Sequence, residues 1–261
     1  MTLHIDTHGT RRIAYSQYKA REKPELAEIV QSSELLGLLD YLPDNTIVVL
    51  GGDGTLLEAI HQFYTEDVVF LGINYGTKGF LMNPISIFEK PKKFQTHSYP
   101  LLECRTEDQV FVAFNEFDIK AGDGKMLHVD AILLPDHHIE IVGDGIVIST
   151  PAGSTGYNAS LGGPILPHDT SAFLLTPKAA WKPRGLSPLI ISESDTIEIR
   201  PVGRKTPVEI YADGQRIVYD FENGSLLTVT QKSDCIRLLV PESESDHWKN
   251  KVLAEQGFIQ I

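Results

Sequence analysis

Apolar and polar positions follow one another in two different ways along the chain, and the change falls near Tyr99-Pro100. Before it, short β-branched runs at 46–50 and 68–73 flank a segment whose apolar residues recur at helical spacing, namely Leu56, Leu57, Ile60 and either Phe63 or Tyr64. This order predicts a right-handed βαβ unit with two buried parallel strands. A strand at 12–16 and a helix over 25–39 complete the predicted α/β region.

After residue 99, most apolar runs alternate with period two, which is typical of strands with one buried face. They cover 109–117, 127–134, 138–142, 145–150, 189–191, 196–200, 208–212, 216–219, 226–230 and 235–240. Asp213-Gly214 indicates a tight hairpin, and one helix is expected from Ser154 to Ser160. The sequence therefore predicts an α/β domain over 1–98 and an all-β, sandwich-like domain over 99–240, with 241–261 packing back on the first.

Composition and charge exclude several classes of protein. The 261 residues are 42% hydrophobic and 22% charged, as in ordinary globular proteins. The formal net charge of -12 disfavours nucleic acid and anionic membranes as partners. The apolar runs are too short to span a membrane, and the first residues lack the pattern of a signal peptide. Cys104 and Cys235 allow one disulfide, but two buried thiols in a reducing, cytoplasmic setting are the expectation.

The glycine-rich segment Gly51-Gly52-Asp53-Gly54-Thr55 lies between a predicted buried strand and a helix. Its glycines allow backbone N–H groups to approach a phosphate, and the helix dipole adds positive potential. Asp53 suits a group that takes a proton from an attacking hydroxyl, or a carboxylate that a divalent cation bridges to phosphate. The alternative is a tight turn with Asp53 as the helix N-cap.

Two shorter polar segments interrupt the apolar runs of the second domain. Asn115-Glu116 lies in an alternating run, so one of the two should face the packed side, where a carboxylate needs a partner such as a ribose hydroxyl. The alternative is a solvent-facing pair at a strand end. Gly143-Asp144-Gly145 precedes another predicted strand and is either part of a site or a hairpin turn.

A further segment, 150–158, is dense in small hydroxyl residues and glycine and directly follows a predicted strand. It gathers hydrogen-bond donors around one point, with Tyr157 able to cover a base or ring. The alternative is a polar loop that leads into a capped helix.

Four segments now stand in one order: GGDGT at 51–55, NE at 115–116, GDGIVISTP at 143–151 and AGSTGYNASLGGPI at 152–165. Because the four segments occur in this order, the sequence resembles the NAD kinase family, and the resemblance extends from about Thr46 to Pro188. The resemblance implies the NAD kinase fold, an α/β domain followed by a β-rich dinucleotide-binding domain, with the dinucleotide between them. It also implies phosphoryl transfer from ATP, or polyphosphate, to the 2′-hydroxyl of the adenosine ribose of NAD⁺, which yields NADP⁺.

The resemblance further implies individual roles. Asp53 is the expected catalytic residue at the 2′-hydroxyl, Asn115 meets the adenine, and Glu116 meets the ribose. Phe80 packs near the adenine, while Asp144 and Asp213 lie toward the nicotinamide half. The expected phosphate-donor loop comprises Gly51, Gly52, Gly54 and Thr55. The expected NAD-binding residues are Gly52, Gly54, Leu57, Phe80, Asn115, Glu116, Asp144, Ala152, Thr155, Gly156, Tyr157, Ser160, Ala179 and Asp213.

Cofactor and partners follow from the same resemblance. Mg²⁺ or another divalent cation is expected to arrive with the nucleotide, with no metal held by protein alone, because His137 and His138 would point apart on a strand. A homodimer or homotetramer is implied, in which a neighbouring subunit completes the nicotinamide half. Lys78 and the short loop 179–187 depart from the family pattern; Lys78 either adds charge near a phosphate or lies on the surface.

Two other functions remain compatible with parts of the pattern. Lipid and sugar kinases share the GGDGT loop, although the later segments and the acidic composition disfavour them. A non-catalytic dinucleotide sensor would bind NAD or NADP without turnover, with Asp53 as a cap.

Overall fold

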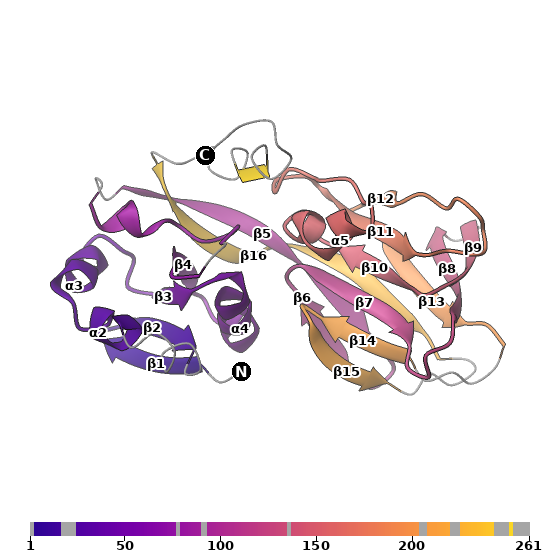
Figure 1. Cartoon of the computed structure of the whole chain (residues 1–261), viewed down its shortest axis with the longest axis horizontal. Helices are drawn as coiled ribbons and strands as arrows, with labels where there is room; N and C mark the ends of the chain where they lie inside the picture. The colour runs from indigo at the N-terminus through magenta and orange to yellow at the C-terminus, as the bar shows by residue number, and fades with distance from the viewer. Residues whose placement is uncertain are drawn as a thin grey trace. The chain divides into compact units, whose positions relative to one another are not determined.

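The computed structural model describes residues 3–16, 25–76, 79–89, 93–134, 137–203, 208–219, 225–242 and 251–252. The chain forms two compact units (Figure 1): unit 1 is Met1–Ser98 with Ile236–Ile261, and unit 2 is Tyr99–Cys235. Each boundary falls inside a long strand, β5 (Phe94–Arg105) or β16 (Leu227–Pro241). Lys78 and most of 241–261 lie outside the described residues, so the interpretations of both stay predictions.

Unit 1 is built on a mostly parallel sheet with the strand order β1-β2-β3-β4-β16. β1 and β2 are antiparallel, whereas β2–β3, β3–β4 and β4–β16 pair in parallel. The elements that precede β5 are β1 (Leu3–His8), β2 (Arg11–Ser16), α2 (Glu25–Ile29), α3 (Ser33–Leu39), β3 (Thr46–Gly51), α4 (Asp53–Phe63), β4 (Val69–Asn74) and the 3-10 turn η1 (Ile85–Phe88).

The predicted βαβ unit is confirmed as β3, α4 and β4, with the two strands paired in parallel from Thr46–Val69 to Gly51–Asn74. Every residue of β3 is buried. α4 buries Leu56, Ala59, Ile60 and Phe63. Burial of both faces of β3 explains its continuous apolar run, since a strand with one wet face would alternate.

The helix predicted over 25–39 is wrong in its continuity, because the chain forms α2 and α3 with a break between them. Ser32 causes the break by acting as the N-cap of α3, where its hydroxyl accepts a hydrogen bond of 3.2 Å from the Leu35 N–H. The apolar residues of both helices still enter one cluster, including Leu26, Leu35 and Leu38. The sequence pattern also does not predict β1, whose residues are partly buried or exposed.

Unit 2 contains two antiparallel layers of strands. One sheet has the order β12-β11-β10-β7-β14-β15. In the other layer β9, β8, β13 and the first part of β16 lie side by side, and β5 pairs with β6. The elements are β6 (Val110–Ala113), β7 (Glu116–Ala121), β8 (Leu127–Leu134), β9 (His137–Gly143), β10 (Gly145–Ser149), the 3-10 turn η2 (Gly153–Thr155), α5 (Tyr157–Ser160), β11 (Ala172–Lys178), β12 (Leu189–Ser192), β13 (Thr196–Pro201), β14 (Val208–Ala212) and β15 (Gln215–Tyr219).

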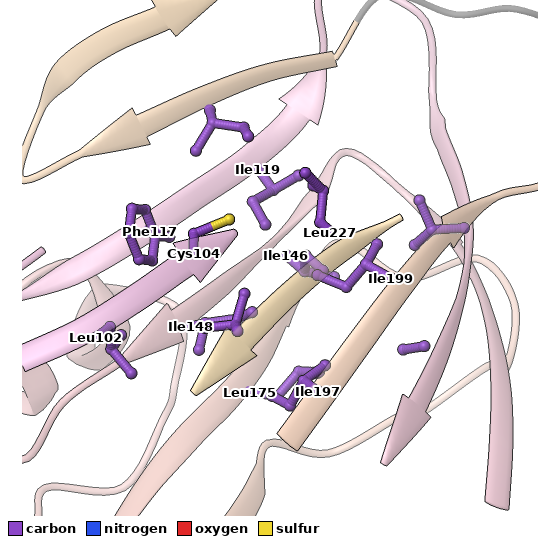
Figure 2. Close-up of a cluster of buried hydrophobic side chains, with 14 of the residues drawn as sticks. Leu102, Cys104, Phe117, Ile119, Ile146, Ile148, Leu175, Ile197, Ile199 and Leu227 are labelled. Carbon is purple, nitrogen blue, oxygen red and sulfur yellow. The ribbon is translucent and has the colours of Figure 1, made fainter. Parts of the chain in front are cut away.

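One hydrophobic cluster joins the two layers of unit 2. Figure 2 shows Phe117 and Ile148 from one sheet in the same cluster as Ile197 and Leu227 from the other. All four side chains are buried. This packing confirms the predicted sandwich-like β domain, in which alternate residues of each strand point into the core.

Several details of the strand prediction are wrong. A bend at Phe114 and Asn115 divides the run 109–117 into β6 and β7. The runs 226–230 and 235–240 form the single strand β16, and the period-two pattern misses β5 and β11, in which consecutive apolar residues are buried. The helix expected over 154–160 is η2 followed by the short α5.

The two predicted glycine turns have different outcomes. At Asp213-Gly214 the hairpin is confirmed, since β14 and β15 pair antiparallel and the φ angles of the two turn residues are 49° and 78°. At Gly143-Asp144-Gly145 the hairpin alternative is wrong, because β9 and β10 belong to different sheets. Asp144 therefore lies where the chain crosses from one layer to the other.

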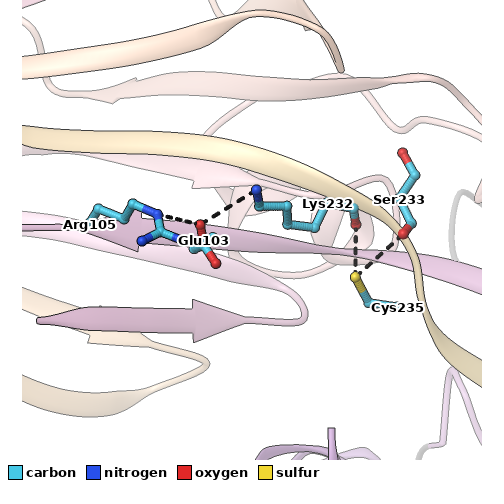
Figure 3. A network of polar contacts seen from close by, with 5 residues as sticks. All are labelled: Glu103, Arg105, Lys232, Ser233 and Cys235. Atoms are coloured by element: carbon cyan, nitrogen blue, oxygen red, sulfur yellow. Dashed lines mark hydrogen bonds and ion pairs between the residues drawn. The ribbon is translucent and has the colours of Figure 1, made fainter. Parts of the chain in front are cut away.

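The surface of unit 2 carries an ion-pair network beside the second cysteine (Figure 3). Glu103 accepts a hydrogen bond of 2.7 Å from Arg105 and pairs with Lys232 at 3.7 Å. The Cys235 thiol donates to the carbonyls of Lys232 and Ser233. Both cysteines are free, and Cys235 is exposed, so the expectation of two buried thiols is wrong for this residue; burial raises the pKa of the Cys104 thiol to about 12. In the described residues no helix is both long and apolar enough to cross a membrane.

Candidate active site

Asp53 opens helix α4 directly after the glycine turn, and backbone groups of unit 1 hold its carboxylate. Gly52 is the N-cap of α4, so the alternative that made Asp53 the N-cap is wrong. Asp53 Oδ2 accepts a hydrogen bond of 2.7 Å from the Phe80 N–H, and Oδ1 accepts one of 2.9 Å from the Leu81 N–H. Each carboxylate oxygen keeps a second acceptor site, so the group can still bind a hydroxyl.

Gly51 and Gly54 differ in whether packing requires a glycine at their positions. A Cβ on Gly51 would lie 2.4 Å from Thr55 Oγ1, so packing against the buried Thr55 requires glycine there. A Cβ on Gly54 would meet no protein atom within 4 Å. Gly54 is exposed in the first turn of α4. The space that its missing side chain leaves is therefore open to a ligand.

In unit 2, the bend at Phe114 and Asn115 is held by the carboxylate of Asp213 from the β14–β15 turn. That carboxylate accepts hydrogen bonds from the N–H groups of Phe114, Asn115 and Glu116 at 2.7, 2.7 and 3.1 Å. Asp213 also donates its own N–H to the carbonyl of Glu116 at 3.1 Å. The hairpin turn thus fixes the backbone that carries Asn115 and Glu116.

The other side of this bend contacts the loop that follows β10. The buried Thr150 hydroxyl donates to the Phe114 carbonyl at 2.7 Å, and the Thr150 N–H donates to the Asn115 carbonyl at 2.9 Å. Gly153 packs so closely that a Cβ there would lie 2.2 Å from the Asn115 carbonyl oxygen. Residues 30 or more positions apart in sequence are thereby brought together at Asn115.

The Glu116 carboxylate is buried at one oxygen and meets other acidic groups. Its Oε2 atom is buried and makes no hydrogen bond within the described residues. A Cβ on Gly156 would lie 3.5 Å from that oxygen. Burial, followed by the negative charges of Asp213 and Asp118, raises the pKa of Glu116 to about 8. The solvent-facing alternative is therefore wrong for this carboxylate, whose buried Oε2 has no hydrogen-bond donor among the described residues.

Two family models match this sequence over the regions just described. Residues 42–99 match the ATP-NAD kinase N-terminal domain, and residues 114–238 match the ATP-NAD kinase C-terminal domain. Together these ranges make up more than half of the chain. The chain belongs to the NAD kinase family.

The sequence is also similar to those of individual NAD kinases over nearly the whole length of the chain. The chain is 32% identical to the NAD kinase of Rickettsia akari over 88% of this chain and 92% of that one. It is 32% identical to the NAD kinase of Rickettsia typhi over 95% of this chain and 98% of that one. The lipid-kinase and sugar-kinase alternatives are therefore wrong, and the chain is an enzyme that phosphorylates NAD.

Two solved NAD kinase structures share the fold. The yeast NADH kinase complexed with NADH matches with a TM-score of 0.69 and 25% identity, covering 83% of this chain and 68% of that one. The NAD kinase from Archaeoglobus fulgidus in complex with ATP matches with a TM-score of 0.67 and 24% identity, covering 95% of this chain and 98% of that one. The latter likeness supports the NAD kinase fold.

The remaining residues that the NAD kinase resemblance singled out fall into both units. Leu57 on α4 and Phe80 are partly buried and lie in unit 1. In unit 2, Asp144 lies between β9 and β10, and Ala179 follows β11. The others belong to the segment after β10, and they are Ala152, Thr155, Gly156, Tyr157 and Ser160. Asp144 and Ser160 are exposed, Ala152 is buried, and Ala179 has a positive φ of 45°.

Sequence reasoning missed a charged pair beside Tyr157. The Lys178 ammonium donates to Asp118 Oδ1 at 2.8 Å and lies 5.0 Å from the centre of the Tyr157 ring. Burial opposes the charge of Lys178, but hydrogen bonds to Asp118 and Tyr157 outweigh it and raise the pKa of the lysine. The sequence signal for this pair was Lys178 itself, a charged residue at the end of the apolar run of β11.

The two adjacent histidines, His137 and His138, lie at the start of β9. His138 Nδ1 lies 3.0 Å from Asp130 Oδ2, and His137 is exposed. Within the described residues, no three His, Cys, Asp or Glu side chains are arranged to hold a metal ion.

Proposed function

We propose that this NAD kinase binds NAD⁺ and ATP and transfers the terminal phosphoryl group with Asp53 as the catalytic residue at the 2′-hydroxyl of the adenosine ribose. The observation that carries this proposal is the Asp53 carboxylate, fixed by the N–H groups of Phe80 and Leu81 at the start of α4. Solved members of the family with NADH and with ATP support the two kinds of substrate. Polyphosphate is the alternative donor.

Asp53 acts by orienting the acceptor hydroxyl and taking its proton. A carboxylate held on both oxygens cannot rotate away, so a hydroxyl bound to it has a defined direction. Phosphoryl transfer requires the attacking oxygen in line with the leaving group, and correct placement supplies much of the rate. Proton transfer to the carboxylate accompanies formation of the new O–P bond.

Gly51, Gly52, Gly54 and Thr55 form the proposed phosphate-donor loop. The first N–H groups of α4 have no partner within the helix, and the positive end of the helix dipole favours anions. The open space at Gly54 allows a phosphate to approach the backbone.

Glu116 binds the ribose, because hydroxyl groups supply the hydrogen-bond donor that its buried Oε2 lacks. Asn115, fixed by Asp213 and Thr150, binds the adenine. The other proposed NAD-binding residues are Gly52, Gly54, Leu57, Phe80, Asp144, Ala152, Thr155, Gly156, Tyr157, Ser160, Ala179 and Asp213.

A divalent cation, Mg²⁺ by preference, accompanies the triphosphate. Asp53, the carboxylate of the GGDGT segment, would be the residue to hold such a cation, as the alternative to its role as proton acceptor. When bound, such a cation neutralises charge on the phosphates.

We propose a homodimer or homotetramer in the cytoplasm. Trp181 and Ile190 are 59% and 60% exposed near the end of β11 and on β12, and large exposed apolar side chains favour a subunit contact. The free thiols of Cys104 and Cys235 suit a reducing compartment.

The deciding experiment measures NADP⁺ formation from NAD⁺, ATP and Mg²⁺ with an NADP-specific dehydrogenase as reporter. Asp53→Asn should lower kcat by at least about a hundredfold. The affinity for NAD⁺ should change little, since the side chain keeps its shape.

The matched control is Asp44→Asn, which changes a carboxylate of unit 1 that is 79% exposed and should leave turnover unchanged. Wild-type turnover in Asp53→Asn would overturn the assignment of Asp53. NADP⁺ formation by the wild type from polyphosphate but not from ATP would assign polyphosphate as the donor.

A further inference from the structure

Lys251, close to the C-terminal end of the chain, contacts the segment that holds Asp53. Its ammonium donates to the carbonyl oxygens of Phe80 at 3.0 Å and Met82 at 2.8 Å, and it also donates to the carbonyl of Gly79. A lysine ammonium has three N–H groups, so three carbonyls match its donors. Lys251 and this segment all belong to unit 1.

The contacts of Lys251 and Asp53 fall on the same two peptide groups. The Gly79–Phe80 peptide presents its carbonyl to Lys251 and its N–H to Asp53. The Phe80–Leu81 peptide does the same. Carbonyl and N–H point in opposite directions from a trans peptide, so the cation and the carboxylate lie at opposite ends of both dipoles. Each charge polarises the peptide toward the other, which strengthens both sets of hydrogen bonds.

The end of the segment has a separate anchor. Asn83, which follows the segment, donates its side-chain amide to the carbonyls of Gly72 and Leu239 at 2.9 and 3.1 Å. That anchor fixes the end of the segment to β4 and β16. The side-chain hydrogen bonds of Asn83 go to β4 and β16, whereas those of Lys251 reach the two peptides that hold Asp53.

We propose that Lys251 is a positioning residue for Asp53, acting through the two peptide groups of Gly79–Leu81. The inference rests on the proposed role of Asp53 and deepens it. Lys251 adds no group to the reacting atoms, but it fixes and polarises the N–H donors that orient the carboxylate. The C-terminal part of the chain is thereby required for turnover.

The test compares Lys251→Gln and Lys251→Arg with the wild type in kcat, KM for NAD⁺ and Tm. Lys251→Gln loses the charge and part of the donor set, so kcat should fall about tenfold or more, because small displacements of a reacting group are costly. KM should change less than kcat. Lys251→Arg keeps the charge and several N–H donors, so it should recover most of kcat.

Amide hydrogen exchange measures the proposed effect locally, because a lysine that only stabilises the fold would not change exchange at these two residues alone. Amide exchange at Phe80 and Leu81 should accelerate in Lys251→Gln, while exchange in β3 stays at the wild-type rate. Lys93→Ala is the matched control, since it removes an exposed lysine of unit 1 outside the segment. It should leave kcat and exchange unchanged.

The outcomes separate this inference from the proposed function. Wild-type kcat in Lys251→Gln, with Asp53→Asn inactive, overturns the role of Lys251 alone. Wild-type turnover in Asp53→Asn instead removes the role of Asp53. If Lys251→Gln does not fold, Lys251→Arg decides: wild-type exchange at Phe80 and Leu81 together with a large loss of kcat in that variant contradicts the proposal.

Discussion

At the scale of one residue, Gly54 and Gly51 differ in what the fold requires. At Gly54 nothing in the fold requires glycine, because a Cβ would meet no protein atom within 4 Å. Gly51, three residues earlier, needs glycine for packing against Thr55. The two glycines of one motif therefore serve different purposes, one structural and one, we propose, for approach of the donor phosphate.

Gly54→Ala tests this distinction. The protein should fold with an unchanged or higher Tm, because alanine favours a helix over glycine by up to about 1 kcal/mol. The KM for ATP should rise about tenfold, equivalent to about 1.4 kcal/mol, since the methyl group occupies space that phosphate uses. Steady-state kinetics with varied ATP and a thermal melt measure both effects.

Gly37→Ala is the control, as its Cβ in α3 would also meet no atom within 4 Å. It should keep the wild-type KM for ATP. The same KM in both variants would contradict a donor site at Gly54.

At the scale of elements, the β14–β15 hairpin supports a bend between two other strands. Asp213 has a positive φ of 49° within the tight turn, and its carboxylate accepts three consecutive backbone N–H groups. The turn is thus both the connection of a hairpin and the support for Asn115 and Glu116.

Asp213→Asn should weaken this support. An amide presents N–H groups to backbone donors, so one or two of the three hydrogen bonds are lost and the free energy of unfolding should fall by about 2–3 kcal/mol. The KM for NAD⁺ should rise with it. Urea denaturation and steady-state kinetics measure the two effects.

Asp169→Asn changes an exposed carboxylate of unit 2 and should alter neither quantity. An Asp213→Asn protein with the wild-type KM for NAD⁺ would show that the bend keeps its geometry without the carboxylate.

At the scale of the whole molecule, the buried Glu116 makes the free energy of unfolding depend on pH. Its pKa rises from 4.5 to about 8 on folding, because burial and then Asp213 and Asp118 disfavour the charge. The folded state therefore binds the proton more tightly than the unfolded state. The stabilisation is fully present below pH 4.5 and is lost as the pH rises through about 8.

Glu116→Gln should flatten this part of the stability profile. Its Tm should exceed that of the wild type at pH 8 and approach it near pH 5. Above pH 8, where the wild-type carboxyl is ionised, the variant should bind NAD⁺ about 1–3 kcal/mol more weakly, because one acceptor oxygen is replaced by an N–H donor. Calorimetry across this range and titration with NAD⁺ provide the measurements. Glu107→Gln, at an exposed site, should reproduce the wild-type profile. If the stability of Glu116→Gln depends on pH as that of the wild type does, the raised pKa of Glu116 is contradicted.

The sequence by itself determined the local elements and the motifs. Continuous apolar runs around a glycine turn predicted β3, α4 and β4, and period-two runs with Asp213-Gly214 predicted the β-rich region and its hairpin, because these patterns depend on neighbouring residues. The four ordered segments indicated the NAD kinase family, which the family models confirm. The roles of individual site residues stay predictions.

Only the tertiary structure decided which distant groups meet. The bend at Asn115 within an apolar run is held by Asp213, almost a hundred positions later. Asp53 is held by Phe80 and Leu81, and the same two peptides reach Lys251 near the end of the chain. Hydrogen bonds between residues so far apart leave no periodic trace in sequence, because they arise when packed strands and helices bring loops together.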